Sequence, residues 1–189
     1  MRVNEIFYSL QGEGFFTGRA AVFLRFAGCT LQCPFCDTDH HTFREMTEAQ
    51  IVAEMAAFPA RHAVITGGEP AMQLTATLVE KLRRAGFFVQ IETNGSLPLP
   101  EGIDWITCSP KSLPVVLPRI NELKVVYGAD TDMAPYGHLA SIATHLRVQP
   151  RHDALARDSA RNLAAAISFV KANPRWSLSL QTHRLINIP

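Results

Sequence analysis

Residues 20–36 read AAVFLRFAGCTLQCPFC, an apolar segment that leads directly into a loop with three cysteines. Residues 20–28 are rich in apolar side chains, as is typical of a buried strand. Cys29, Cys33 and Cys36 follow it closely, and the remaining cysteine, Cys108, is far away in the sequence. Ligands bind at the carboxyl ends of strands in parallel sheets and barrels. The segment therefore predicts a site at the end of a strand.

The composition is that of an ordinary globular protein, with 189 residues, 47% hydrophobic and 19% charged. This length suits one domain over residues 1–189 that buries a core without disulfides. The net charge of +1 and the lack of a basic block argue against a nucleic-acid partner. No apolar run reaches the roughly 18 residues of a membrane helix, and the N-terminus lacks signal-peptide features, so we expect a cytoplasmic protein with reduced thiols.

Strands and helices alternate along the chain. Beyond 20–28, strands are predicted at 62–70, 87–95, 104–111, 120–128 and 145–150, with a final strand and short tail over 176–189. Helices are predicted at 47–58, 74–86 and 154–173, with Thr47 as an N-cap and Gly86 as a stop. The fold class is therefore α/β: about six parallel strands in a partial (β/α) barrel with reduced helix coverage, plus N- and C-terminal extensions. The length excludes a complete eight-fold barrel.

Polar and glycine residues collect where the predicted strands end. These clusters are 66–69, 92–95, 109–111 and 149–150. Because the carboxyl ends of parallel strands share one edge, we expect these clusters to form a single rim with the cysteine loop.

Three closely spaced thiols allow several interpretations. Three buried structural cysteines are improbable in one short loop. Zinc needs a fourth ligand, which His40 or His41 could supply, so a zinc site stays open. Three thiolates also suit an iron–sulfur cluster in which one iron is left for another ligand. An open iron indicates chemistry at the cluster rather than electron transfer alone.

The spacing Cys29-x3-Cys33-x2-Cys36 resembles that of the radical S-adenosylmethionine (SAM) enzymes. Gly67-Gly68-Glu69-Pro70 resembles the turn whose backbone holds the methionine amine in that family. The resemblance implies a [4Fe-4S] cluster whose open iron binds SAM and whose electron generates a 5′-deoxyadenosyl radical.

A longer resemblance extends from residue 4 to the C-terminus. NEIFYSLQGEGFFTGRAAVFLRFAGCTLQCPFCDTDH (4–40), together with ITGGEP, ETNG, CSPK, ELKVV, RVQP and QTHRLINIP, resembles the 7-carboxy-7-deazaguanine synthase family of queuosine and 7-deazapurine biosynthesis. That implies conversion of 6-carboxy-5,6,7,8-tetrahydropterin to 7-carboxy-7-deazaguanine with loss of ammonia, assisted by Mg²⁺. It also implies a homodimer and a flavodoxin-type or other low-potential electron donor.

The resemblance assigns roles to individual positions. It implies SAM contacts from Phe35, Cys36, Asp37, Gly68, Ser109, Pro110, Lys111 and Gln149. It implies substrate contacts from Leu10, Gln11, Gly12, Glu13, Arg25, Thr66, His183 and Pro189, the last through its terminal carboxylate. Thr38 is the implied Mg²⁺ ligand, although a threonine there also suits a turn cap. Magnesium keeps substrate and water oxygens around it, so one hydroxyl ligand is reasonable.

The chemistry of these residues agrees with a pterin that carries a carboxylate. Arg25, inside an apolar strand, can bind a carboxylate with two parallel hydrogen bonds. Gly12 lets the backbone approach a flat ring, and Glu13 can accept hydrogen bonds from the donor edge of the pterin. The apolar residues Leu185, Ile186 and Ile188 predict that the tail is packed rather than frayed.

Two other functions remain open on the sequence alone. A glycyl-radical activase shares the cysteine motif but acts on a protein, and a zinc- or cluster-binding interaction module would need no SAM. The segment QGEG and Thr38 favour a small-molecule substrate. Cys108 does not fit the cluster spacing and is expected to be a small buried side chain.

Overall fold

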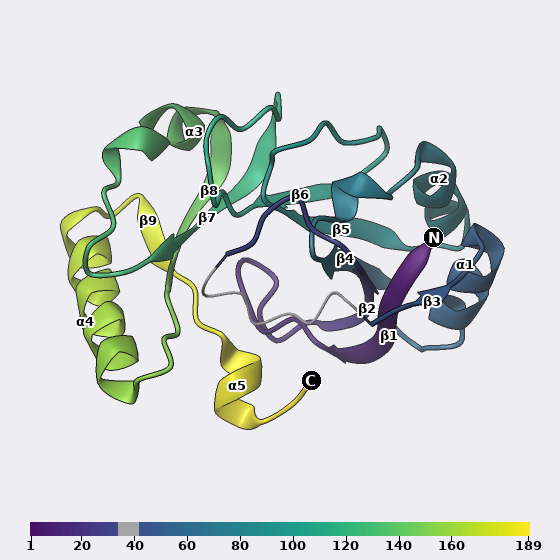
Figure 1. Cartoon of the computed structure of the whole chain (residues 1–189), viewed down its shortest axis with the longest axis horizontal. Helices are drawn as coiled ribbons and strands as arrows, with labels where there is room; N and C mark the ends of the chain where they lie inside the picture. The colour runs from purple at the N-terminus through teal and green to yellow at the C-terminus, as the bar shows by residue number, and fades with distance from the viewer. Residues whose placement is uncertain (34–41) are drawn as a thin grey trace.

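The structure is a computed structural model that describes residues 1–33 and 42–189. Within these ranges, nine strands form one sheet in the order β3-β1-β2-β4-β5-β6-β7-β8-β9 (Figure 1). The strands are β1 Arg2–Leu10, β2 Ala20–Phe26, β3 Arg44–Glu45, β4 His62–Gly67, β5 Phe88–Thr93, β6 Trp105–Cys108, β7 Ile120–Tyr127, β8 Ala143–Pro150 and β9 Trp176–Leu178. The helices are α1 Glu48–Ala56, α2 Ala76–Arg84, α3 Gly137–Ile142, α4 Ala156–Ala172 and α5 Thr182–Ile186, with short 3-10 turns at Pro70–Met72 and Ala134–Tyr136.

The six predicted parallel strands are confirmed as β2 and β4 to β8, and the curled sheet is the expected partial barrel. β9 adds a further parallel strand beside β8. β1 pairs antiparallel with β2, and β3 pairs antiparallel with β1. The N-terminal extension is thus part of the sheet, which the sequence did not indicate. No helix in the described ranges is both long enough and apolar enough to cross a membrane.

Helices cover the outer face of the sheet unevenly. α2 packs on β5, whereas α4 lies along β8 and β9 at the opposite side of the molecule (Figure 1). The two predicted helix signals are confirmed. Thr47 caps α1 in a reciprocal capping box with Gln50, and Gly86 follows α2 with a φ of +84°.

Side chains alternate along the strands between the apolar core and the inside of the barrel. In β7, Leu123 and Val125 are fully buried in the main apolar cluster. Glu122 and Lys124, which alternate with them, instead contact the loop that follows β1. A strand can therefore build the core and the site at the same time.

Aromatic side chains close the barrel at the amino ends of three parallel strands. His62, Phe88 and Trp105 are the first residues of β4, β5 and β6. The ring of Phe16, from the loop after β1, lies with its centroid 4.8, 5.6 and 4.7 Å from these three rings, respectively. The opposite, carboxyl ends are left for ligands.

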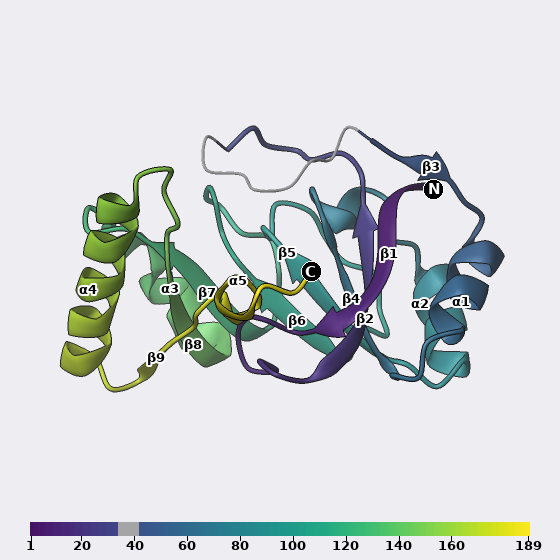
Figure 2. The ribbon, with the colours of Figure 1, turned by 90° about the horizontal axis from the view of Figure 1, so that it is seen from below.

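The C-terminal segment differs from the prediction. After the three residues of β9, the chain forms the helix α5 instead of continuing as a strand. Leu185 and Ile186 are 72% and 57% exposed, so the expectation that these two pack the tail was wrong, whereas Ile188 is partly buried and lines the cavity described below. A five-residue helix points the Leu185 and Ile186 side chains outward, and hydrogen bonds hold the tail instead. Figure 2 shows α5 and the C-terminus close to β1.

Candidate functional site

A cavity of about 1000 Å³ opens at the carboxyl ends of the parallel strands. That volume is at the upper end for small-molecule sites, so it can take two ligands. The structure brings most of the predicted residues together here. Its lining includes Leu10, Gln11, Gly12, Glu13, Arg25, Cys29, Cys33, Thr66, Gly68, Ser109, Lys111, Gln149, His183 and Pro189. Pro110 is buried and is not part of the lining.

The cysteine loop borders this cavity. Cys29 and Cys33 line it, and the backbone N–H of Leu31 donates to Cys29 Sγ at 3.4 Å. Two thiols on one rim, each a potential thiolate ligand, fit the cluster that the motif implies. The predicted residues Phe35, Cys36, Asp37 and Thr38, like His40 and His41, lie outside the described residues.

The glycine turn after β4 is pressed against the end of β2. Gly67 has a φ of +125°, and a Cβ there would lie 2.1 Å from the Phe26 carbonyl oxygen. A Cβ on Gly68 would lie 2.0 Å from the carbonyl oxygen of Gly28. The N–H of Glu69 donates to that same oxygen at 2.9 Å. Only glycine permits this approach, which fixes the turn directly beside Cys29.

Glu69 ties this turn to the next strand. Its side chain is fully buried and accepts hydrogen bonds from Thr93 Oγ1 at 2.7 Å, the Asn94 N–H at 2.7 Å and the Ala71 N–H at 3.0 Å. Burial raises the pKa of Glu69, and these hydrogen bonds oppose that rise only in part. The carboxylate thereby holds the ends of β4 and β5 in one arrangement.

The predicted substrate segment is held by the C-terminal helix. The Gly12 carbonyl oxygen accepts hydrogen bonds from the N–H and the hydroxyl of Thr182, both at 2.9 Å. A Cβ on Gly12 would lie 2.2 Å from Nδ1 of His183. The hydroxyl of Ser9 donates to a Pro189 oxygen at 2.8 Å. His183 and Pro189, predicted from the tail, therefore do lie beside residues 10–13.

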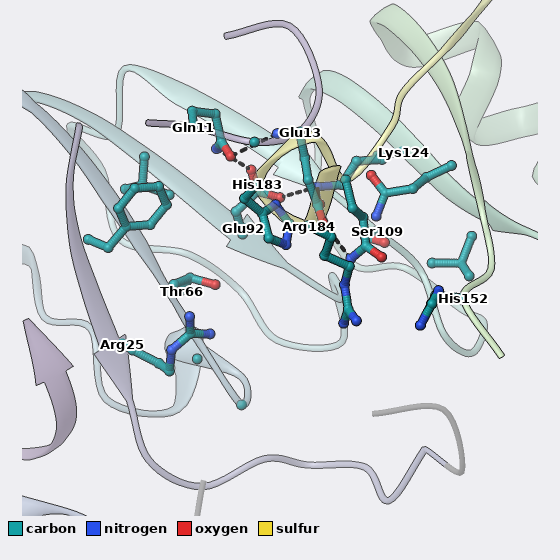
Figure 3. A pocket seen from close by; sticks show the side chains of 18 of the residues that line it. Gln11, Glu13, Arg25, Thr66, Glu92, Ser109, Lys124, His152, His183 and Arg184 are labelled. Carbon is teal, nitrogen blue, oxygen red and sulfur yellow. Dashed lines mark hydrogen bonds and ion pairs between the residues drawn. The ribbon is translucent and has the colours of Figure 1, made fainter. Parts of the chain in front are cut away.

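Arg25 and Thr66 lie next to each other in paired strands and line the same cavity (Figure 3). Arg25 Nε donates to Glu5 Oε1 at 2.7 Å, and its guanidinium lies 5.6 Å from the centre of the Phe7 ring. On the opposite side, Lys111 Nζ donates to Ser109 Oγ at 2.6 Å, and Gln149 accepts from Ser179 at 2.9 Å.

A buried charge cluster that the sequence reasoning missed lies in the barrel beside these groups. Lys124 Nζ donates to Glu13 Oε2 at 2.5 Å and to Glu92 Oε2 at 2.9 Å (Figure 3). Lys124 is 4% exposed. A lone lysine between apolar residues in ELKVV was the available signal, as Arg25 was in β2.

The pKa values in this cluster move in different directions. Burial would raise the pKa of Glu13, but Lys124 outweighs it and lowers that pKa to about 2. Burial raises the pKa of Glu92, where Lys124 opposes the rise while Glu122 and Glu13 add to it. Burial would lower the pKa of Lys124, but the carboxylates raise it. One carboxylate is thus firmly ionised and the other is easier to protonate.

Comparison with known proteins gives consistent results. Residues 24–126 match the model of the radical SAM superfamily. The chain is 47% identical over 188 residues to the 7-carboxy-7-deazaguanine synthase of Bacteroides thetaiotaomicron, covering 99% of this chain and 98% of that protein. It is 44% identical over 212 residues to the enzyme of the same name from Burkholderia multivorans, again covering 99% and 98%. The crystal structure of QueE from Escherichia coli superposes with a TM-score of 0.78 at 28% identity, covering 95% of this chain and 92% of that one.

Proposed function

This chain belongs to the 7-carboxy-7-deazaguanine synthase family of radical SAM enzymes, and we propose that it converts 6-carboxy-5,6,7,8-tetrahydropterin to 7-carboxy-7-deazaguanine with loss of ammonia. The product belongs to queuosine biosynthesis. Membership in this family does not favour the glycyl-radical activase or the zinc-binding module. When bound, the [4Fe-4S] cluster and SAM supply the one-electron chemistry that removes a hydrogen atom from the substrate.

The observation that carries this proposal is the meeting of two sequence motifs at one cavity. Cys29, Cys33 and the Gly67–Gly68 turn form one part of its wall, and residues 10–13 form another. The cysteines, with Cys36, would hold the cluster. Gly68, Ser109, Lys111 and Gln149 would contact SAM, together with Phe35, Cys36, Asp37 and Pro110.

The substrate half of the site has groups for both ends of the pterin. Arg25 carries the charge for the substrate carboxylate, while Glu13 carries an acceptor for the amino edge. Thr66, His183, Pro189 and residues 10–12 would complete the contacts. The tail helix excludes water from the Gly12 carbonyl, because Thr182 occupies that oxygen with two hydrogen bonds.

Further parts of the proposal concern partners. Thr38 would bind Mg²⁺ with substrate oxygens completing the shell. A flavodoxin-type or other low-potential donor would reduce the cluster, and two copies of the chain would form a homodimer. We also propose that residues 1–189 are one catalytic domain and that it acts in the cytoplasm, because thiolate ligands and a low-potential donor need a reducing compartment.

The test is a turnover assay with a matched pair of cysteine variants. Protein reconstituted anaerobically with iron and sulfide receives dithionite, SAM, Mg²⁺ and 6-carboxytetrahydropterin, and products are identified by mass spectrometry. We expect 7-carboxy-7-deazaguanine from the wild type. Cys33→Ala should lose a cluster ligand and show no product above background. Cys108→Ala should keep its iron and its activity, because Cys108 is fully buried and its pKa is raised by burial to about 12.

Two outcomes would contradict parts of the proposal. Formation of 5′-deoxyadenosine without deazaguanine would retain the radical chemistry but reject this substrate. If protein with a full complement of iron gave neither product, the radical chemistry itself would be rejected.

A further inference from the structure

Three charged side chains from three elements meet inside the barrel: Glu13 from the loop after β1, Glu92 from β5 and Lys124 from β7. We call them the Glu13–Lys124–Glu92 cluster. All three line the cavity, and Lys124 bridges the two carboxylates at 2.5 and 2.9 Å (Figure 3). The exposed fraction of these side chains is 5% for Lys124, 19% for Glu13 and 17% for Glu92. The cluster is therefore shielded from bulk water but open to a ligand.

Hydrogen bonds from neighbouring amides fix the orientation of both carboxylates. Glu13 Oε1 accepts from Gln181 Nε2 at 2.9 Å, and Glu92 Oε1 accepts from Gln90 Nε2 at 2.8 Å. Since each carboxylate oxygen can accept two hydrogen bonds, acceptor capacity remains on both groups. In each carboxylate, an amide binds one oxygen and the Lys124 ammonium binds the other, so the plane of the carboxylate is fixed.

The cluster has more acceptors than its protein donors satisfy. Two carboxylates share one ammonium, and Glu122, 1% exposed, lies close to them. Glu122 does not line the cavity, so it adds negative charge next to Glu92 without itself facing a ligand. A buried excess of negative charge is costly unless donors reach it. The amino group and ring N–H groups of a pterin are donors of this kind.

We propose that Lys124 is a positioning residue for substrate recognition: its ammonium holds Glu13 and Glu92 together so that the pair accepts hydrogen bonds from the amino edge of the pterin. This inference rests on the pterin substrate proposed above. Lys124 itself acts through the carboxylates, which are the groups that contact the ligand.

The charges around Glu92 predict how pH affects recognition. Lys124 faces it from β7 with Glu122, Glu13 faces it from the loop after β1, and Lys111 contributes from beyond β6. Gln90 connects it to His62, and burial lowers the pKa of that imidazole. Without Lys124, the already raised pKa of Glu92 rises further. Only the ionised form of Glu92 accepts the hydrogen bonds of the ligand. On acidification, the variant without Lys124 should therefore lose ligand binding at a higher pH than the wild type.

The experiment compares two ligands that differ at the proposed contact. 6-Carboxypterin has the 2-amino group, and 6-carboxylumazine has an oxygen in its place. Binding of each to reconstituted holoenzyme with SAM is measured by calorimetry between pH 5 and 8. We expect the wild type to prefer 6-carboxypterin. Lys124→Met should weaken its binding by about 10- to 100-fold, reduce the preference and shift the acid limb to higher pH.

Two further variants keep the result interpretable. Lys81→Met removes a surface lysine that pairs with Glu48, so it should leave binding unchanged. Glu13→Gln/Lys124→Met removes one negative and one positive charge and so keeps the net charge of the site. It replaces Lys124→Met in the experiment if that single variant does not fold. It should fold and still lose the preference for the 2-amino group.

The outcomes separate this inference from the proposed function. Wild-type preference for 6-carboxypterin in a folded Lys124→Met or in the double variant would overturn the role of Lys124 alone. Equal losses of iron, SAM and pterin binding in both variants would also overturn it, because Lys124 would then only support the fold. Wild type that binds iron and SAM but no 6-carboxypterin would overturn the pterin substrate together with this inference.

Discussion

The two ends of the parallel strands have different structural roles. At the amino ends, His62, Phe88 and Trp105 pack around Phe16 and close the barrel. At the carboxyl ends of the same strands, glycines and polar side chains surround a cavity of about 1000 Å³. One loop serves both ends, because residues 11–13 line the cavity while Phe15 and Phe16 join the aromatic group.

Stability and ligand binding therefore depend on different ends of the strands. The aromatic end tolerates changes that only cost packing energy, since nothing reacts there. The carboxyl end depends on close backbone contacts and buried charges, where small changes displace ligands. Variants at the two ends should therefore separate loss of stability from loss of ligand binding.

The largest effect is expected at the glycine turn. Gly67→Ala would place a Cβ 2.1 Å from the Phe26 oxygen and force a side chain into a φ of +125°. We expect a loss of about 3 kcal/mol or more in the free energy of unfolding, with loss of SAM binding. Gly86→Ala is the matched control, since its φ is +84° but its Cβ meets open space, so it should cost about 1 kcal/mol. Equal effects in thermal unfolding would refute the role of the close contact.

A smaller effect on stability, without an effect on ligands, is expected at the aromatic end. Phe16→Ala removes a half-buried ring that contacts four others, and should lower the free energy of unfolding by about 2 kcal/mol. Iron content and SAM affinity of the folded variant should match the wild type. Phe43→Ala, at a ring that is 44% exposed, should cost less than about 1 kcal/mol. Loss of SAM affinity in Phe16→Ala would show that the two ends are coupled.

The smallest effect concerns pH. The pKa of Glu13 is lowered from 4.5 to about 2 in the folded state, so its stabilising contribution is present above pH 4.5 and is lost as pH falls toward 2. As the pH falls from 4.5 toward 2, the wild type loses this contribution and Glu13→Gln does not. The free energy of unfolding should therefore fall by about 1 to 2 kcal/mol less in Glu13→Gln than in the wild type. Urea unfolding of both proteins, prepared without the iron–sulfur cluster, measures this difference. Parallel pH curves would show that Glu13 is not stabilised by Lys124.

Much of this architecture was predictable from local patterns. Six parallel strands followed from apolar runs bounded by glycine and polar residues, and Thr47 and Gly86 marked helix ends correctly. The rim followed from the rule that such strands end together. β1 was missed because pairing with β2 is a tertiary choice, and residues 2–10 show no clear two-residue alternation of burial.

The charge cluster and the tail were harder to predict for a related reason. Lys124 meets Glu13 across 111 positions of sequence, and no local pattern reports such a contact. The tail was assigned to packing by Leu185 and Ile186, whereas hydrogen bonds from Ser9 and Thr182 hold it. Apolar composition reports the core well, but it does not report hydrogen bonds between distant segments.

The hydrogen bonds from Thr182 to Gly12 have a consequence for how the enzyme is made. The two residues are 170 positions apart, so Gly12 leaves the ribosome long before its partner exists. The wall of the cavity cannot close until residue 182 has emerged and folded back. An iron–sulfur cluster delivered to the nascent chain would meet an incomplete cavity. The productive order of assembly is therefore folding of the polypeptide first and insertion of iron second.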